Sequence, residues 1–348
     1  MTFHADAFIP EIDSCADPAT SCSRQIDAGE CFVLLSPHHG GGTRSVRVRH
    51  ALYGAPGAPV IAVQGGISAT RYAGTHLGNS GWWETLVGAD RAIDTHRFRV
   101  LSIEWLDRAD LDAASNADEA TRAIGSEDQA DALAAVLAEH GIRRLHAFVG
   151  ASYGAMVGIA FAARHPERLR RLVAIAGAHR AHPLAIAVRN LQRGIVRFAA
   201  RHGDIEAGLD LARRLAMTTY RGEREFAERC AAAPAFRDGR YRFAEEDWLE
   251  AAGASFVRRF GAERFLALSE SIDLHAIDPA DVHVPTTLIG IASDRLVPLA
   301  DLCELQRSCG APATLHVIDS RYGHDAFLKE SGQIGPLVDE ALGARSLA

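Results

Sequence analysis

The segment Gly150-Ala151-Ser152-Tyr153-Gly154 places a serine between two glycines. The apolar run Leu145–Val149 before it is typical of a strand, and Ala155–Arg164 after it is typical of a helix. A serine on a sharp strand-to-helix turn is the setting of a nucleophile elbow, which holds the hydroxyl out at the carboxyl edge of a sheet. A buried serine in a glycine-rich turn is the alternative, but this context favours Ser152 as a nucleophile.

A serine hydroxyl is a weak nucleophile until a base takes its proton, and here an acid and then a histidine should follow it along the chain. Asp294 follows the apolar run Thr286–Ile291, and His324 follows the last such run. Because the carboxyl ends of parallel strands lie at one edge of a sheet, we expect both near Ser152. Asp294 would hold the imidazole, and His324 would move the proton. Three other acids compete for the first role: Asp301, Asp319 and Asp325.

The loop Gln64-Gly65-Gly66-Ile67 follows another apolar run. Paired glycines let backbone amides come close to a developing oxyanion. We therefore expect the backbone N–H groups of Gly66 and Tyr153 to form an oxyanion hole. A simple glycine turn is the alternative.

A frame of alternating strands and helices must position these side chains. Eight apolar runs predict the strands: Cys31–Ser36, Ser45–Tyr53, Pro59–Gln64, Phe98–Ile103, Leu145–Val149, Leu172–Ala176, Thr286–Ile291 and Thr314–Ile318. The middle runs are apolar without alternation, as in strands covered on both faces. Ser126 to Gln129 fits a capping box at the start of a helix. The order predicts an α/β fold with a mostly parallel sheet of eight strands.

The rhythm of strands stops between about Ala178 and Asp281, where the chain is rich in alanine, arginine and leucine and helix-like throughout. We expect a core formed by residues 31–178 and 281–348. A helical lid insertion would occupy residues 179–280, and residues 1–30 would form an N-terminal arm.

Composition excludes several classes of protein. The 348 residues include 37 Lys+Arg and 44 Asp+Glu, a formal net charge of −7, and 48% are hydrophobic, which argues against a disordered chain and a nucleic-acid partner. No apolar run is long enough for a membrane span, and the start lacks the features of a secretory signal. The six cysteines form no CxxC pattern, and His179 and His182 lack a third ligand. We expect a cytoplasmic protein without a metal site or a membrane partner.

Several motifs resemble the homoserine O-acyltransferase family, whose members have the α/β-hydrolase fold. They are Gly81-Trp82-Trp83, Ile93-Asp94-Thr95 with Phe98, the elbow GASYGAM, Asn190-Leu191-Gln192-Arg193, Thr219-Tyr220-Arg221 and Gly323-His324-Asp325-Ala326-Phe327-Leu328. The matches are spread over most of the chain, and the ones around Tyr220 and His324 are specific to the family rather than to the fold. Trp82 and Trp83 could line a pocket or pack in the core.

The resemblance implies a ping-pong reaction in methionine biosynthesis. An acyl-CoA, as a co-substrate and without any cofactor, would acylate Ser152, and the hydroxyl of L-homoserine would then take the acyl group. The resemblance also implies that Arg193 binds the carboxylate of the amino acid, Asp325 its ammonium group, and that Tyr220 contacts it. A guanidinium fork matches a carboxylate, although an exposed helix face and a helix N-cap are alternatives for Arg193 and Asp325. A homodimer is also expected.

The chain departs from the family at two places near the pocket. Glu104-Trp105-Leu106-Asp107-Arg108 replaces a glycine-rich loop, and Tyr153 stands where methionine is usual. A succinyl donor needs a cation for its free carboxylate, and Arg71 could supply it, which favours succinyl-CoA slightly over acetyl-CoA; an ordinary surface arginine is the alternative. Acyl transfer to L-serine, an esterase or thioesterase, and a ligand-sensing module without turnover remain open.

Overall fold

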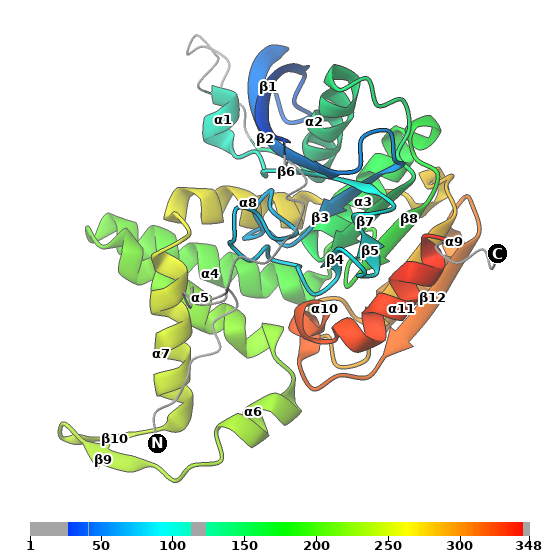
Figure 1. The fold of residues 1–348 in the computed structure, drawn as a ribbon. Helices are drawn as coiled ribbons and strands as arrows, with labels where there is room; N and C mark the ends of the chain where they lie inside the picture. The colour runs from blue at the N-terminus through cyan, green and yellow to red at the C-terminus, as the bar shows by residue number, and fades with distance from the viewer. Residues whose placement is uncertain (1–26, 41, 113–122, 344–348) are drawn as a thin grey trace.

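The computed structural model describes residues 27–40, 42–112 and 123–343 (Figure 1). Its centre is an eight-stranded sheet in the order β1-β2-β6-β3-β7-β8-β11-β12. The bounds are β1 (Asp27–Leu35), β2 (Arg44–Gly54), β3 (Val60–Gln64), β6 (Arg99–Ile103), β7 (Ala147–Ala151), β8 (Leu172–Ile175), β11 (Thr286–Ile291) and β12 (Ala313–Ile318). The β1–β2 and β2–β6 pairs are antiparallel and the others are parallel. The predicted sheet of eight mostly parallel strands is confirmed.

The first strand starts earlier than the sequence suggests. Strand β1 begins at Asp27 and pairs with β2 along its whole length, so residues 27–30 of the expected arm belong to the sheet. Residues 28–30 continue the alternation of more and less exposed side chains along β1, because pairing with β2 holds their backbone in an extended conformation. The rest of the expected arm lies outside the described residues.

Helices cover both faces of the sheet, and each face has its own apolar core. Ala62 and Phe148 point to the face covered by α2 (Ser126–Glu139) and α3 (Tyr153–Arg164). Their neighbours Val63 and Val149 point to the other face, where α11 (Ser331–Ala341) packs. Successive side chains of a strand point to opposite faces, and both faces are dry, which explains why these strands are continuously apolar.

Further elements of the core lie in the connections between the strands of the main sheet or after its last strand, and the two short strands among them, β4 (Val87–Gly88) and β5 (Ile93–Asp94), pair only with each other in a separate sheet. The helices among them are α1 (Arg108–Asp112), α9 (Leu299–Ser308) and α10 (Ala326–Lys329). Among the described residues, none of the helices combines the length and the apolar character needed to cross a membrane.

A helical insertion lies between β8 and β11 and stands to one side of the sheet (Figure 1, green to yellow). It consists of α4 (Pro183–Arg201), α5 (Ile205–Tyr220), α6 (Glu223–Arg229), α7 (Ala244–Val257) and α8 (Ala262–Leu274), with a hairpin of β9 (Ala235–Arg237) and β10 (Arg240–Arg242). The sequence predicts these helices but not the hairpin. We call this insertion the lid.

The two ends of the lid meet beside the core. Arg180 and Ala276 form an isolated antiparallel bridge, and the N–H of Ile277 donates to the carbonyl of His179 at 2.8 Å. The lid therefore leaves and rejoins the core at one narrow neck.

Candidate active site

Ser152 lies in the turn between β7 and α3, with φ +55° and ψ −120°. This conformation is strained for a residue with a side chain, and such strain is common at functional sites. Glycine is required on both sides: a Cβ on Gly150 would lie 2.2 Å from the carbonyl oxygen of Gly154, and one on Gly154 would lie 2.2 Å from that of Gln64. The sharp turn packs tightly against β3 and leaves the hydroxyl of Ser152 at the edge of the sheet.

Ser152, His324 and Asp294, which the sequence proposes as a triad, are joined by hydrogen bonds. The Oγ of Ser152 lies 2.7 Å from Nε2 of His324, and Nδ1 of the same ring lies 2.7 Å from Oδ2 of Asp294. The other carboxylate oxygen of Asp294 accepts the backbone N–H groups of Leu296 and Val297 at 2.8 and 3.1 Å. A hydroxyl on an imidazole that a fixed carboxylate holds can be activated as a nucleophile.

The pKa of the His324 imidazole is raised above its ordinary value. Burial is the largest influence and would lower this pKa. The charge of Asp294, the hydrogen bond to Asp294 and the charge of Asp325 raise it and together outweigh burial and a smaller effect of Arg189. The proton is therefore stabilised on the ring, as a shuttle between alcohol and leaving group needs.

The turn that carries His324 is held by both the lid and the core. Gly323 has φ +59°, and a Cβ on it would lie 2.8 Å from the carbonyl oxygen of Tyr220 at the end of α5. On the other side, the indole N–H of Trp83 donates to the carbonyl of Phe327 at 2.9 Å. Trp83 is thus a buried support of this turn, whereas Trp82 stacks on it and lines the cavity.

The two residues expected to form an oxyanion hole, Gly66 and Tyr153, lie in the loop after β3 and directly after Ser152. Gly66 lines the same cavity as Ser152 and His324. The side chain of Tyr153 is buried and its hydroxyl lies 2.5 Å from Oγ of Ser271, so only its backbone can serve the site. Burial also raises the pKa of the Tyr153 phenol, which keeps it neutral.

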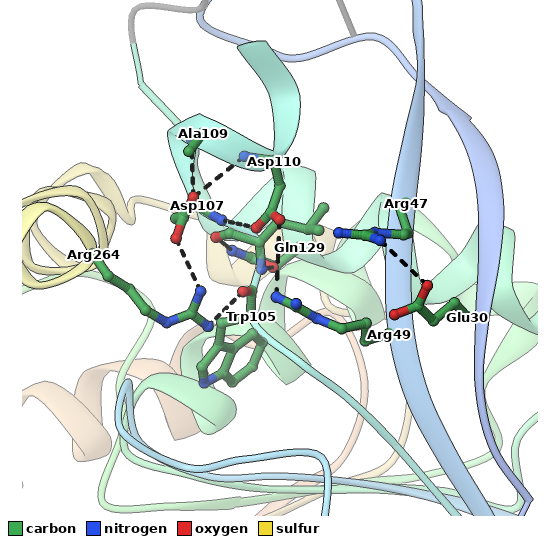
Figure 2. A network of polar contacts seen from close by, with 10 residues as sticks. Glu30, Arg47, Arg49, Trp105, Asp107, Ala109, Asp110, Gln129 and Arg264 are labelled. Carbon is green, nitrogen blue, oxygen red and sulfur yellow. Dashed lines mark hydrogen bonds and ion pairs between the residues drawn. The ribbon is translucent and has the colours of Figure 1, made fainter. Parts of the chain in front are cut away.

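Trp105, in the segment that differs from the family pattern, contacts both the glycine loop after β3 and the lid. Its indole N–H donates to the carbonyl of Gly66 at 2.9 Å. Its own carbonyl accepts Nη2 of Arg264 at 2.7 Å, and Nη1 of Arg264 lies 3.0 Å from Asp107 (Figure 2). Arg264 belongs to α8, so this segment connects the glycine loop after β3 to the lid.

A cavity of about 470 Å³ opens over the triad between core and lid. Its lid wall is largely apolar and includes Ala216, Met217, Trp248, Ala252, Phe256, Phe260, Phe265 and Ile272. Ligand sites of this size typically have apolar walls and a few placed polar groups. The lining also includes polar side chains from the core loop 68–80 and arginines of the lid, so the cavity is suited to a substrate that is partly apolar and partly charged.

Asp325 and Tyr220, both expected to contact substrate, line this cavity. The ring of Tyr220 lies 5.7 Å from that of His324. Oδ2 of Asp325 lies 2.9 Å from Nε of Arg221, whose Nη1 also contacts Glu225. The carboxylate of Asp325 is thus held in place beside the triad.

Arg213 and Arg259 also line the cavity, and the sequence analysis missed both. The guanidinium of Arg213 lies over the rings of Tyr220 and Phe256, 5.3 and 4.8 Å from their centroids. Within the described residues, neither arginine forms an ion pair with a carboxylate. Arg213 precedes Tyr220 by two helical turns, so a shared helix face was the signal that could have found it.

The structure does not bring Arg193 or Arg71 into this cavity. Arg193 is buried, with Nη2 2.6 Å from Asp273 and Nη1 donating to the carbonyl of Ser269. Arg71 donates to the carbonyl of Gly29 at 3.3 Å and lies over the ring of Tyr72. Neither residue lines the cavity, and both guanidinium groups have partners within the protein, which does not support the substrate contacts expected of them.

The histidines considered for a metal have other partners. His179 lies 3.7 Å from Glu304, and His182 caps α4 by accepting the N–H of Leu184. Over residues 27–40, 42–112 and 123–343, no group of three or more His, Cys, Asp or Glu is placed to hold a metal ion.

Comparison with known proteins agrees with this geometry. Residues 59–331 match the model of a family described as having the alpha/beta hydrolase fold. The chain is also 48% identical to a homoserine O-succinyltransferase of Xanthomonas campestris pv. campestris, over 97% of this chain and 88% of that protein. The chain belongs to the homoserine O-acyltransferase family.

Other members of this acyltransferase family are more distant. A serine O-succinyltransferase of Xylella fastidiosa is 30% identical, over 91% of this chain and 98% of the relative. The crystal structure of a homoserine O-acetyltransferase from Bacillus anthracis superposes with a TM-score of 0.81 at 19% identity, over 93% of this chain and 99% of that one. This superposition confirms the predicted α/β-hydrolase fold.

Proposed function

We propose that this protein transfers a succinyl group from succinyl-CoA to the hydroxyl of L-homoserine through an acyl-enzyme on Ser152. The observation that carries the proposal is the hydrogen-bonded series Ser152–His324–Asp294 at the floor of a lidded cavity. The name of the 48% identical relative supports the donor and the acceptor. The place of the reaction in methionine biosynthesis and in the cytoplasm is part of the proposal.

The first half-reaction acylates the enzyme. Nε2 of His324 takes the proton of Ser152 as its oxygen attacks the thioester carbonyl, and the N–H groups of Gly66 and Tyr153 receive the negative charge on the carbonyl oxygen. The tetrahedral intermediate expels the CoA sulfur, which takes the proton from the imidazolium. The products are succinyl-Ser152 and free CoA, so CoA is a co-substrate and no cofactor is needed.

The second half-reaction repeats these steps with the amino acid. His324 takes the proton of the homoserine hydroxyl, whose oxygen attacks the acyl-enzyme. The intermediate then collapses, and the proton returns to Oγ of Ser152. The apolar lid wall limits access of water, so the ester survives until the acceptor arrives.

The acceptor is held by two opposite charges near the triad. The ammonium and carboxylate groups of an amino acid are attached to one carbon, so their partners must lie close together. Asp325 supplies the negative partner, and we assign the positive one to Arg213 instead of Arg193. Tyr220 lies under Arg213 and beside His324, which positions it against the carbon chain of the substrate.

Other reactions of the same site are distinguished by one panel of assays. Release of free CoA is measured with succinyl-CoA and acetyl-CoA, each with L-homoserine, L-serine or no amino acid. We expect rapid release only with succinyl-CoA and homoserine together. Dominant use of acetyl-CoA or serine would reassign the substrate, and release without any amino acid would indicate a thioesterase.

The mechanism has its own test. Ser152→Ala should abolish CoA release and the succinyl adduct that intact-mass spectrometry detects on the wild-type enzyme after mixing with succinyl-CoA alone. A Ser152→Ala enzyme that still transfers the acyl group would refute the mechanism, as would the complete lack of turnover expected of a sensing module.

We also propose that the protein is a homodimer that pairs through α4. Leu184, Leu191 and Phe198 are 59%, 64% and 62% exposed and lie one heptad apart along this helix. Such spacing places the three side chains on one stripe, as in helix-to-helix packing between two chains. A stripe that pairs with its own copy forms a closed, twofold contact.

A further inference from the structure

Two arginines without a carboxylate partner among the described residues line the cavity, and the single carboxylate of an amino acid substrate would pair with only one of them. Arg221 is paired with Asp325 and Glu225, whereas the guanidinium groups of Arg213 and Arg259 have no carboxylate partner in the part of the chain that the structure describes. The inference below rests on the proposed function, in which L-homoserine brings one carboxylate to Arg213. Arg259 then faces the cavity with no partner.

Arg259 lies in the turn just after α7, and its N–H donates to the carbonyl of Phe256 at 3.0 Å. Trp248, Ala252 and Phe256 line the cavity from successive turns of this helix, and Arg259 follows Phe256 by one further turn. Phe260 and Phe265 line the wall next to it. These rings offer an apolar surface beside the guanidinium on which the methylene groups of an acyl chain can pack.

The electrostatics at this position favour an anion. The pKa of the Arg259 guanidinium is lowered, mainly by partial burial and then by the positive charges of Arg258 and Arg213. Like charges held together without a counterion raise each other's energy, and an arriving carboxylate would relieve this repulsion.

We propose that Arg259 binds the free carboxylate of the succinyl donor and thereby gives the enzyme its preference for a dicarboxylic acyl group over acetyl. A succinyl group carries its carboxylate two methylene groups from the reacting carbonyl, whereas acetyl ends in a methyl group. The role that the sequence suggests for Arg71 thus falls to a residue of the lid.

The test compares the two donors on Arg259→Gln, at saturating L-homoserine. Losing a charge-assisted hydrogen bond should lower kcat/KM for succinyl-CoA by about 10- to 100-fold. The value for acetyl-CoA should change by less than about twofold, which also shows that the variant is folded. Arg259→Lys should recover part of the loss, and Arg237→Gln, at an exposed position of the lid outside the cavity lining, is the matched control.

Each other result overturns the proposal. An equal loss with both donors would mean that Arg259 binds a group common to them, such as the phosphates of CoA, or supports the fold. No loss with succinyl-CoA would mean that the carboxylate is bound elsewhere. If wild-type enzyme used neither donor, the proposed function itself would fail and this inference with it, and that result is distinct from a change confined to Arg259 variants.

Discussion

The indole of Trp105 stands edge-on to the ring of Tyr153, with centroids 4.9 Å apart and an angle of 64° between the rings. The same indole donates its N–H to Gly66, so one side chain contacts both residues that we assign to the oxyanion hole. Both Trp105 and Tyr153 stand where the chain departs from its family. The two residues that differ from the family pattern therefore pack against each other, and we treat them as one structural unit beside the loop after β3.

Trp105→Phe tests this arrangement, because phenylalanine keeps most of the ring contact and loses the N–H. A neutral hydrogen bond contributes about 1 kcal/mol, which corresponds to about a fivefold loss in kcat if it holds the loop after β3 in place. The KM for L-homoserine should stay nearly constant. Tyr153→Phe, which removes only the hydroxyl near Ser271, is the control. Unchanged kcat in Trp105→Phe would show that the loop is held without the indole.

The pH dependence of the acylation step should report His324. Only the neutral imidazole accepts the proton of Ser152, and the pKa of this ring is raised, so kcat/KM should increase with pH through a value above about 6.5. Asp294→Asn removes the main partner that raises this pKa. The variant should have its inflection at lower pH and a rate about 10³- to 10⁴-fold lower. An inflection that does not move would exclude Asp294 as the partner of His324.

Arg213 and Arg193 should give different defects. Arg213→Gln should raise the KM for L-homoserine by about 10- to 100-fold, because a charged hydrogen bond to the substrate carboxylate is lost. It should lower the unfolding free energy by only about 1 kcal/mol, through the lost contacts with the rings of Tyr220 and Phe256. Arg193→Gln removes one of the two buried arginines on Asp273, which keeps its contact with Arg189, and should destabilise the protein by about 1–3 kcal/mol. Kinetics and urea unfolding on both variants separate the roles. A stable Arg193→Gln enzyme with a raised KM would restore the role that the family resemblance gives it.

His275 should make the fold sensitive to acid. Its Nδ1 lies 2.7 Å from the hydroxyl of Ser126, its Nε2 lies 3.1 Å from the carbonyl of Ala178, and burial lowers its pKa to about 3. The folded state keeps this ring neutral, while the unfolded chain takes up a proton near pH 6.5. Stability is thus complete above pH 6.5 and falls by about 1.4 kcal/mol per pH unit below it, down to the folded pKa.

Urea unfolding at pH 7 and pH 5 measures this effect. His275→Gln should be less stable than wild type at pH 7 and should lose less stability between the two pH values. His202→Gln, at an exposed position after α4, should keep the wild-type difference. Equal pH dependence in wild type and His275→Gln would assign the acid sensitivity to other groups.

The proposed dimer should separate when its stripe becomes charged. Leu191→Glu with Phe198→Glu places carboxylates on facing copies of α4 and should convert a dimer to a monomer in analytical ultracentrifugation. Val317→Glu, at an exposed position of β12, is the control. A wild-type protein that sediments as a monomer at all concentrations would reject the proposal.

The sequence predicts the strands correctly where burial on both faces requires a continuous run of apolar residues. Both faces of β3 and β7 are covered, so continuous apolar runs mark these strands. The hairpin of β9 and β10 was missed because its strands are short and rich in exposed arginine. The cap of α2 was placed one residue late: Gly125 is the N-cap, and its N–H is accepted by Asp128.

The triad could be predicted because chain order and strand ends decide its position. The charged wall of the cavity could not, since it depends on how lid helices turn against the core. Arg193 and Arg213 look alike in sequence, each on an amphipathic helix. Arg193 forms an ion pair with Asp273, which lies far along the chain, whereas Arg213 has no such carboxylate partner among the described residues and lines the cavity.

The bridge between Arg180 and Ala276 makes the lid a unit that protein engineering, or evolution, can replace. Since the lid joins the sheet at a single pair of adjacent backbone segments, a different helical module could be spliced there without re-routing any strand. Swapping this cassette between relatives would exchange the lid arginines proposed to bind donor and acceptor, while the triad and Asp325 stayed with the sheet.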